Sequence, residues 1–187
     1  MTKVVAIIQA RMGSTRLPGK VMKKLVDKSV LAHVIKRVEQ SKLIDEIVIA
    51  TKKLERDDVI EEEADKCGVN YYRGSEDNVL SRFYYSAQEN NADIIIRITS
   101  DCPLIDPYVI DELVSFYQEN DYNLVTNAGS DLKQRTYPRG LDVEVFSFNL
   151  LKESFNNALK DYQLEHVTPY IYENKDKIYY YKNDNDY

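Results

Sequence analysis

The chain has 187 residues, of which 43% are apolar and 30% are charged, and its formal net charge is −6. This composition suits one globular domain with a substantial core. The negative charge disfavours a nucleic-acid or anionic-membrane binder, which usually presents a basic surface. The first apolar run, Val4 to Ile8, is too short for a signal peptide or a membrane span. Two isolated cysteines without a CxxC spacing predict reduced thiols and a cytoplasmic protein.

Strands and helices are expected to alternate along the first two thirds of the chain. The run at 4–8 predicts a buried strand because it ends at a loop. Leu31, Val34, Ile35 and Val38 follow the helical spacing i, i+3, i+4, i+7, which predicts a helix at 30–41. The same reasoning predicts a strand at 47–50, a helix at 56–66 ended by Gly68, a strand at 69–72, a helix capped by Asp77, a strand at 94–98, and a helix opened by Asp106 and Pro107.

The pattern changes in the last third. The sequence predicts a strand at 123–126, a loop at 128–140, a helix at 148–160, a further helix at 164–173 with Pro169 near its start, and a last strand at 178–182. Between them, residues 142–145 alternate with period two, so Asp142 and Glu144 are expected on an exposed strand face. Repeated βα units followed by a mixed segment predict an α/β fold, a three-layer α/β/α sandwich with a mostly parallel sheet.

The loop after the first strand carries the strongest functional signal. It reads QARMGSTRLPGK, in which Gly13 allows close backbone approach, Ser14 offers donors, and Arg11, Arg16 and Lys20 supply positive charge. A triphosphate requires this combination of N–H groups and cations. Neither GxxxxGK[ST] nor GxGxxG fits the loop. A solvated basic turn is the alternative, but the carboxyl end of a strand is where open α/β sheets bind ligands.

Two further segments suggest a metal and a sugar. Asp101 follows the fourth strand at the same sheet edge, and Mg²⁺ is held by one or two carboxylates together with phosphate oxygens; the alternative is a turn residue before Pro103. Arg139 beside the same-face carboxylates Asp142 and Glu144 suits a sugar acid, or else forms a solvated strand face. His166 could contact substrate or assist proton transfer, and a packed or capping histidine is the alternative.

Five segments occur in the order found in the cytidylyltransferase family: IIQARMGSTRLPGKVM, RGSEDNVLSRF, RITSDCPLIDP, YPRGLDVEVFS and EHVTPYIYE. The chain resembles that family over essentially its whole length, and it is most similar to the branch that contains spore coat polysaccharide biosynthesis protein F. The resemblance implies a nucleotide-diphospho-sugar-transferase-like (Rossmann-like) fold, CTP as nucleotide donor and Mg²⁺ as cofactor.

The resemblance also implies roles for individual residues. It assigns nucleotide binding to Ala10, Arg11, Gly13, Ser14, Arg16, Lys20, Arg73, Ser75, Asp77 and Asn78, and the metal to Asp101. The implied reaction is attack of a sugar hydroxyl on the α-phosphorus of CTP with loss of pyrophosphate, in surface or spore-coat polysaccharide biosynthesis. Arg11, Arg16, Lys20 and Asp101 are expected to carry catalysis, and Arg139, Asp142, Glu144 and His166 to bind the sugar. Because the loop reads ARMGSTR where sialic-acid enzymes have ARGGSKR, the sugar need not be a sialic acid.

Related chains continue into a strand with a TVD-like motif that usually brings a second metal carboxylate, and nothing in this sequence matches it. The expectation is therefore one nucleotidyltransferase domain over residues 1–187 that lacks a C-terminal segment. Nucleic acid and membrane are not expected as partners, and a homodimer is left open. The alternatives are a non-catalytic nucleotide-binding module and a glycosyltransferase of the same architecture. The latter would usually show a DxD-type motif, whereas residues 100–102 supply only Asp101.

Overall fold

The computed structural model describes residues 2–14, 16–128 and 135–183. The strands are β1 (Val4–Gln9), β4 (Glu46–Lys52), β5 (Asn70–Gly74), β6 (Ile94–Thr99), β7 (Leu124–Thr126), β8 (Glu144–Ser147) and β9 (Ile178–Tyr180), with β2 (Lys24–Leu25) and β3 (Lys28–Ser29) forming a separate hairpin. The helices are α1 (Val30–Val38), α2 (Asp58–Cys67), α3 (Val79–Glu89), α4 (Pro107–Glu119), α5 (Phe148–Asn157), α6 (Asp161–His166) and α7 (Pro169–Asn174), with the 3-10 turns η1 (Lys20–Met22) and η2 (Glu55–Asp57).

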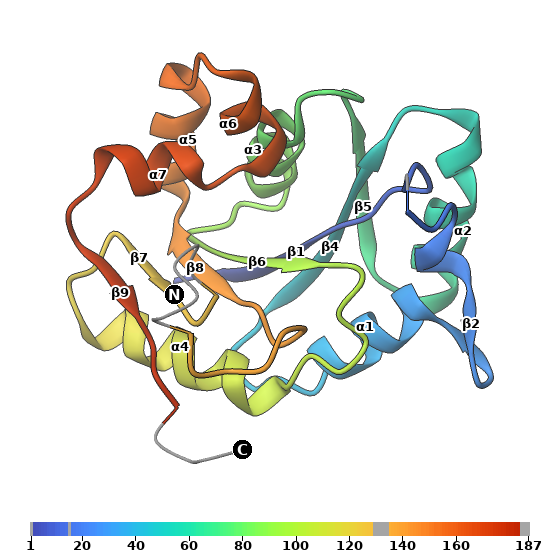
Figure 1. Ribbon diagram of the computed structural model, residues 1–187, viewed down its shortest axis with the longest axis horizontal. Helices are drawn as coiled ribbons and strands as arrows, with labels where there is room; N and C mark the ends of the chain where they lie inside the picture. Colours follow the sequence, from blue (N-terminus) through green and yellow to red (C-terminus); the bar gives the residue numbers. More distant parts are fainter. Residues whose placement is uncertain (1, 15, 129–134, 184–187) are drawn as a thin grey trace.

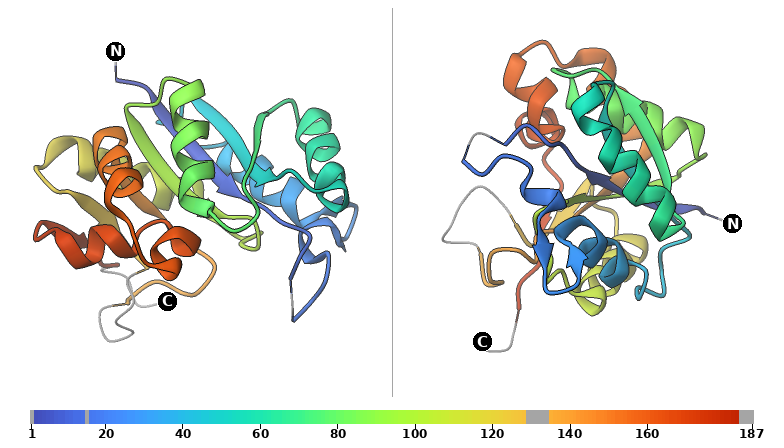
Figure 2. Two further views of the ribbon diagram at one scale, coloured as in Figure 1. Left: turned by 90° about the horizontal axis from the view of Figure 1, so that it is seen from above. Right: turned by 90° about the vertical axis from the view of Figure 1, so that its right-hand side faces the viewer.

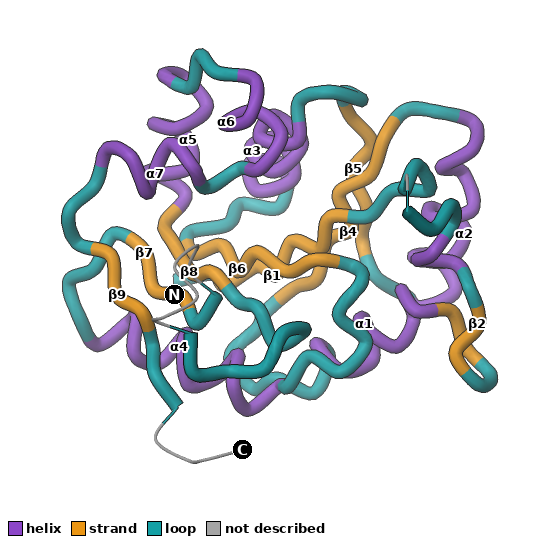
Figure 3. Tube along the Cα trace, in the orientation of Figure 1, coloured by secondary structure: helices purple, strands orange, loops and turns teal. Residues whose placement is uncertain are grey.

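A seven-stranded sheet forms the middle layer, in the order β5-β4-β1-β6-β8-β7-β9 (Figure 1). The strands β5, β4, β1 and β6 are parallel, and among the described strands of this sheet only β8 runs against its neighbours. Helices lie on both sides of the sheet, as Figures 2 and 3 show. The prediction of a three-layer sandwich with a mostly parallel sheet is therefore confirmed.

The apolar run Val4–Ile8, which makes up all of β1 except its last residue, explains the central place of this strand. Val4, Ala6 and Ile8 face one layer, where they pack with buried residues of α1, α2 and α4. Val5 and Ile7 face the other layer, where they pack with α3, α5 and α7. A strand with helices on both faces must be apolar at every position, since no side of it meets water.

Two local predictions are wrong. The cap of α3 is Asn78, whose side chain accepts the Ser81 N–H at 2.7 Å, and not Asp77, which lies one residue too early. The single helix predicted at 164–173 is two helices, because the chain turns sharply at Val167 and Pro169 then begins α7. The other predicted helices and strands lie within a few residues of their expected places, whereas residues 129–134 of the loop predicted at 128–140 lie outside the described residues. Among the described residues, no helix is long and apolar enough to cross a membrane.

The sheet brings the two strongest sequence signals together. β1 ends at Gln9, which pairs in register with Thr99 at the end of β6. The Ser100 N–H also donates to the Gln9 carbonyl at 3.2 Å. The loop after β1 and the segment that carries Asp101 therefore leave the same edge of the sheet side by side.

Candidate active site

A cleft of about 380 Å³ opens at the carboxyl ends of β1 and β6. This volume lies within the usual range for small-molecule sites. The cleft brings together seven of the predicted site residues: Ala10, Arg11, Ser14, Arg16, Lys20, Asp101 and His166. Its other lining residues are Gln9, Val21, Val79, Arg82, Thr99, Ser100 and Glu165. We call this the main cleft, and residues 10–20 the nucleotide loop, of which residue 15 lies outside the described residues.

The nucleotide loop folds around one carbonyl. The Met12 carbonyl accepts the N–H groups of Ser14 at 2.9 Å and of Gly19 at 3.0 Å. Gly19 adopts a left-handed φ of 66°, which a glycine takes without strain, and leads directly into η1 at Lys20. Arg11 and Arg16 are exposed, and among the described residues neither has a hydrogen bond or an ion pair. The loop thus offers free guanidinium groups to a ligand in the main cleft.

Asp101 faces the loop across the main cleft. Its carboxylate forms an ion pair with Lys20 Nζ, 81 positions away in the sequence. Burial by itself raises the pKa of Asp101, but hydrogen bonds from Lys20 and Thr99 outweigh that effect and hold the pKa below its usual 3.8. The carboxylate is therefore charged at neutral pH, and it lies beside Lys20 in the cleft that Arg11 and Arg16 also line.

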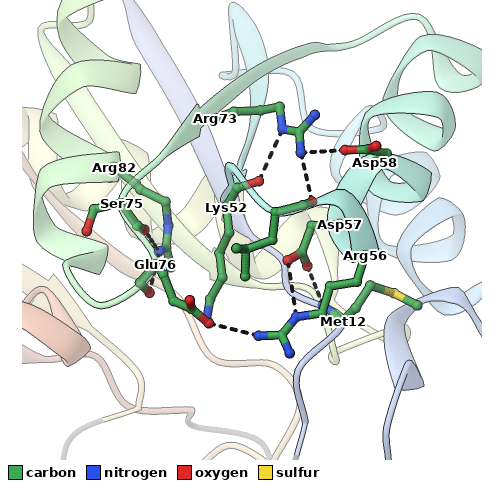
Figure 4. A network of polar contacts seen from close by, with 10 residues as sticks. Met12, Lys52, Arg56, Asp57, Asp58, Arg73, Ser75, Glu76 and Arg82 are labelled. Carbon is green, nitrogen blue, oxygen red and sulfur yellow. Dashed lines mark hydrogen bonds and ion pairs between the residues drawn. The ribbon is translucent and has the colours of Figure 1, made fainter.

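A polar network lies beneath the loop (Figure 4). The Met12 N–H donates to Asp57 Oδ1 at 2.7 Å, and Asp57 is fully buried. Its other oxygen, Oδ2, has no hydrogen-bond partner among the described residues and lies 3.9 Å from Arg56 Nε. Arg56 Nη2 donates to Glu76 Oε1 at 2.8 Å, and Lys52 Nζ donates to the same oxygen at 3.1 Å. The network links η2 to the nucleotide loop on one side and to the segment after β5 on the other.

Gly13 and Arg73 lie outside the main cleft. A Cβ atom added to Gly13 would sit 3.4 Å from Arg56 Nη2, so this glycine packs against the network beneath the loop. The Arg73 guanidinium is held by protein acceptors: the Lys52 and Leu54 carbonyls at 3.1 and 2.9 Å, and the carboxylates of Asp58 and Glu61 at 2.6 and 2.9 Å. The structure does not bring Arg73 to a position where it faces the main cleft.

Asp77 and Asn78 line a second cleft of about 280 Å³, which shares Arg11, Val79 and Glu165 with the main cleft. The side chain of Lys52, only 6% exposed, contributes a buried cation to it. Ser75 lies behind these residues, where its Oγ accepts the Asn78 N–H at 3.2 Å. The segment after β5 therefore adjoins the main cleft through this second one.

Arg82 and Gln9 are lining residues that sequence reasoning missed. Arg82 is 2% exposed, and its Nη1 donates to the Ser75 carbonyl and, at 3.1 Å, to that of Glu76. Burial, and then the nearby charge of Arg11, lower its pKa to about 10. A Cβ on Gly74 would meet Arg82 Cγ at 2.9 Å, so only glycine permits this approach. Arg82 Nε and Gln9 Oε1 are buried without a hydrogen-bond partner among the described residues. The sequence does contain a signal for Arg82, because this cation lies on the buried face of α3, between Leu80 and Phe83.

The four residues predicted for the sugar do not converge. His166 lines the main cleft, whereas Arg139 is exposed and lines neither cleft. Asp142 is paired with Arg135 and not with Arg139. The prediction that Glu144 presents its carboxylate on an exposed face is wrong, because Glu144 is 7% exposed. Its carboxylate is occupied by Arg97, Thr168 and Tyr172.

A cation-lined cleft at the carboxyl edge of a mostly parallel sheet, with a charged carboxylate opposite the cations, is the arrangement with which α/β proteins bind phosphate-bearing ligands such as nucleotides. The Cytidylyltransferase family model matches residues 5–186. The chain therefore belongs to the cytidylyltransferase family of nucleotidyltransferases.

Individual relatives agree with this assignment. The chain is 41% identical over 178 residues to spore coat polysaccharide biosynthesis protein SpsF of Bacillus subtilis, covering 91% of this chain and 70% of that protein. A solved cytidylyltransferase from Leptospira borgpetersenii superposes with a TM-score of 0.91 at 38% identity, covering 100% of this chain and 78% of that one. A CMP:2-keto-3-deoxy-manno-octonic acid synthetase solved with CTP has a TM-score of 0.75 at 20% identity, covering 97% and 90% of the two chains, and shares the fold.

Proposed function

We propose that this chain transfers CMP from CTP to the hydroxyl group of a sugar or sugar acid and releases pyrophosphate. The observation that carries the proposal is the convergence of Arg11, Arg16 and Lys20 on one cleft opposite a charged Asp101, in a member of this family. In the proposed reaction the sugar oxygen forms a bond to the α-phosphorus and its hydroxyl proton passes to solvent, while the bond from that phosphorus to the pyrophosphate oxygen breaks and pyrophosphate leaves.

The protein's task in this reaction is alignment and charge neutralisation. Arg16 and Lys20 are exposed or half-buried side chains on the loop, so they reach the outer phosphates and neutralise the departing pyrophosphate. Arg11 lies between the two clefts and suits the phosphate nearest the nucleoside. Arg82 is held in place by two carbonyls, so it supplies fixed positive charge at the base of the main cleft.

The donor set around Asp101 fits Mg²⁺ in the presence of a nucleotide. No group of three or more His, Cys, Asp or Glu side chains forms a metal site among the described residues. Mg²⁺ commonly takes one or two carboxylates and completes its shell with substrate phosphates and water. Asp101 offers one charged carboxylate beside the cations that would hold those phosphates. When bound, Mg²⁺ supplies neutralising charge at phosphate oxygens.

The sugar side of the proposal rests on His166 and on the relatives. His166 and Glu165 line the rim of the main cleft, where a hydroxyl-bearing substrate would meet the nucleotide. The names of the relatives refer to spore coat polysaccharide and to a sugar acid. We accordingly propose a sugar or sugar acid destined for a surface polysaccharide, activated in the cytoplasm where CTP is available.

The test measures pyrophosphate release with CTP, UTP, ATP and GTP, each against 2-keto sugar acids, uronic acids and neutral sugars, with and without Mg²⁺. We expect release only with CTP, one class of sugar and Mg²⁺. Asp101→Asn keeps the side-chain shape but loses the charge that a hard cation prefers, so it should remain folded and lose most of the Mg²⁺-dependent activity. Calorimetric titration of CTP without sugar provides the control. Failure of CTP to bind, or equal binding of all four triphosphates with no release, would contradict the proposal.

A further inference from the structure

The chain makes a strained turn beside the main cleft. Val167 has φ 70° and ψ −57°, and the Thr168 N–H donates to the His166 carbonyl at 2.8 Å. These angles and this i to i+2 hydrogen bond define the rarer of the two γ-turn types, which is strained. A β-branched residue with positive φ is a genuine outlier. Such strain persists only where the surroundings enforce it, and it gathers at functional sites.

The turn at Val167 follows two residues that line the main cleft. It is held in place by the buried side chain of Val167 and by the hydrogen-bonded side chain of Thr168. Glu165 and His166 precede it and face the cleft at the end of α6. The side chain of Val167 is fully buried in the core on the α3 and α5 side of the sheet. Thr168 is 3% exposed, and its Oγ1 donates to Glu144, at 3.1 Å to Oε1 and 3.3 Å to Oε2.

Glu144 is itself held firmly. It begins β8 and stands directly opposite Arg97 of β6, which pairs with its carboxylate. Tyr172 of α7 donates to Glu144 Oε1 at 2.7 Å, and burial raises the pKa of Tyr172, so its hydroxyl remains a donor. Arg97 lies two residues before Thr99, which lines the main cleft. One carboxylate thus ties the strand that leads to Asp101 to the turn that presents His166.

We propose that Glu144 is a positioning residue, which acts through Thr168 to hold the strained turn at Val167 and so keeps Glu165 and His166 at the main cleft. The effect on turnover rests on the proposed function, but the position of His166 does not, and it is measured in the protein without nucleotide. The proposal also explains why a carboxylate is kept at a buried position, where an apolar residue would otherwise be expected.

Three variants separate positioning from general stability. Thr168→Val removes the hydroxyl that links the turn to Glu144, and Thr168→Ser retains it. Tyr172→Phe is the matched control, because it also removes one hydroxyl donor from Glu144 but does not release the turn. The readout is the imidazole resonance of His166 in a proton–carbon spectrum. The chain has two histidines, and His33 on α1 serves as the internal reference.

We expect the His166 resonance to move by more than its line width in Thr168→Val, and to stay at its wild-type position in Thr168→Ser and Tyr172→Phe, with His33 unmoved throughout. Both hydroxyl deletions should lower the unfolding midpoint. If Thr168→Val does not fold, Thr168→Ala makes the same comparison. An unmoved His166 in the folded hydroxyl-free variant would overturn the proposal, and so would an equal movement in Tyr172→Phe. Titration of the same samples with CTP tests nucleotide binding separately, so a failure of the proposed function would be recognised as such.

Discussion

Removal of the Asp57 carboxylate tests whether the nucleotide loop is held from beneath. Asp57 lines neither cleft, so Asp57→Ala takes away no ligand contact. It does remove the acceptor of the Met12 N–H, which is 2.7 Å away. A hydrogen bond to a charged group contributes about 1.5–3 kcal/mol. Asp57 Oδ2 is buried without a hydrogen-bond partner among the described residues and has only the distant Arg56 Nε at 3.9 Å, so relief of its desolvation offsets part of the loss.

The energy of the hydrogen bond between Met12 and Asp57 also sets the expected loss of CTP affinity. If the loop loosens in the free variant, CTP must restore its order on binding, and a cost of about 1.5–3 kcal/mol becomes a roughly tenfold to hundredfold weaker affinity. Calorimetric titration measures the affinity, and urea unfolding measures the stability. Asp58→Ala is the matched control, because its half-exposed carboxylate pairs with Arg73 and does not contact the loop. Wild-type CTP affinity in Asp57→Ala, or equal weakening in Asp58→Ala, would refute the reasoning.

Three further outcomes are expected. Arg16→Ala should weaken CTP binding about tenfold or more and CMP binding much less, because Arg16 is assigned to the outer phosphates; equal losses in calorimetric titrations would contradict that assignment. The pKa of Asp101 is lower in the folded protein than its ordinary value of 3.8. The charged carboxylate therefore stabilises the fold fully above pH 3.8, and this stabilisation is lost as the pH falls through the lowered pKa. Asp101→Asn should therefore be less stable than wild type at pH 6 and converge with it in acid, as urea unfolding at several pH values would show; a constant difference would argue against the effect. Arg73→Ala should lose roughly 1–3 kcal/mol of unfolding free energy and keep its CTP affinity, because its acceptors are protein groups; weaker CTP binding would restore Arg73 to the nucleotide site.

The part of the site that could be predicted lies at the carboxyl ends of two largely apolar strands, β1 and β6. Val4–Ile8 is wholly apolar and Ile94–Ile98 is apolar except for Arg97, so both runs indicate buried strands. Parallel strands bring the loops at their carboxyl ends to one edge of the sheet. Lys20 and Asp101 were expected near each other on that ground alone, and they form an ion pair. The prediction needed no knowledge of side-chain packing, because topology fixes this edge.

The residues that were misplaced or missed, Glu144 and Arg82, depend on contacts that a local sequence pattern does not reveal. The alternation at 142–145 correctly indicates a strand, but it assumes that the polar face meets water. Here α7 brings Tyr172, and the turn before it brings Thr168, over that face, while β6 brings Arg97, so Glu144 is buried in a complete set of partners. Arg82 was overlooked for a similar reason, since its acceptors are the carbonyls of the preceding turn. Local patterns reveal a polar side chain, but only the assembled fold shows whether its partner is water or protein.

The exposure of the ion pair between Lys20 and Asp101 bears on the proposed function. The two side chains are 32% and 42% exposed, and such pairs contribute only about 0.2–1 kcal/mol. A charge-assisted hydrogen bond from Lys20 to a phosphate is stronger, at about 1.5–3 kcal/mol. In the proposed function, a triphosphate would therefore separate the pair, because Lys20 would bind its oxygens and Asp101 would be left to hold a cation. A buried pair would resist separation, because each charge would lose its partner in a medium that solvates it poorly. Its partial exposure is therefore consistent with an ion pair that orients both groups in the free protein and would open when the proposed substrate binds.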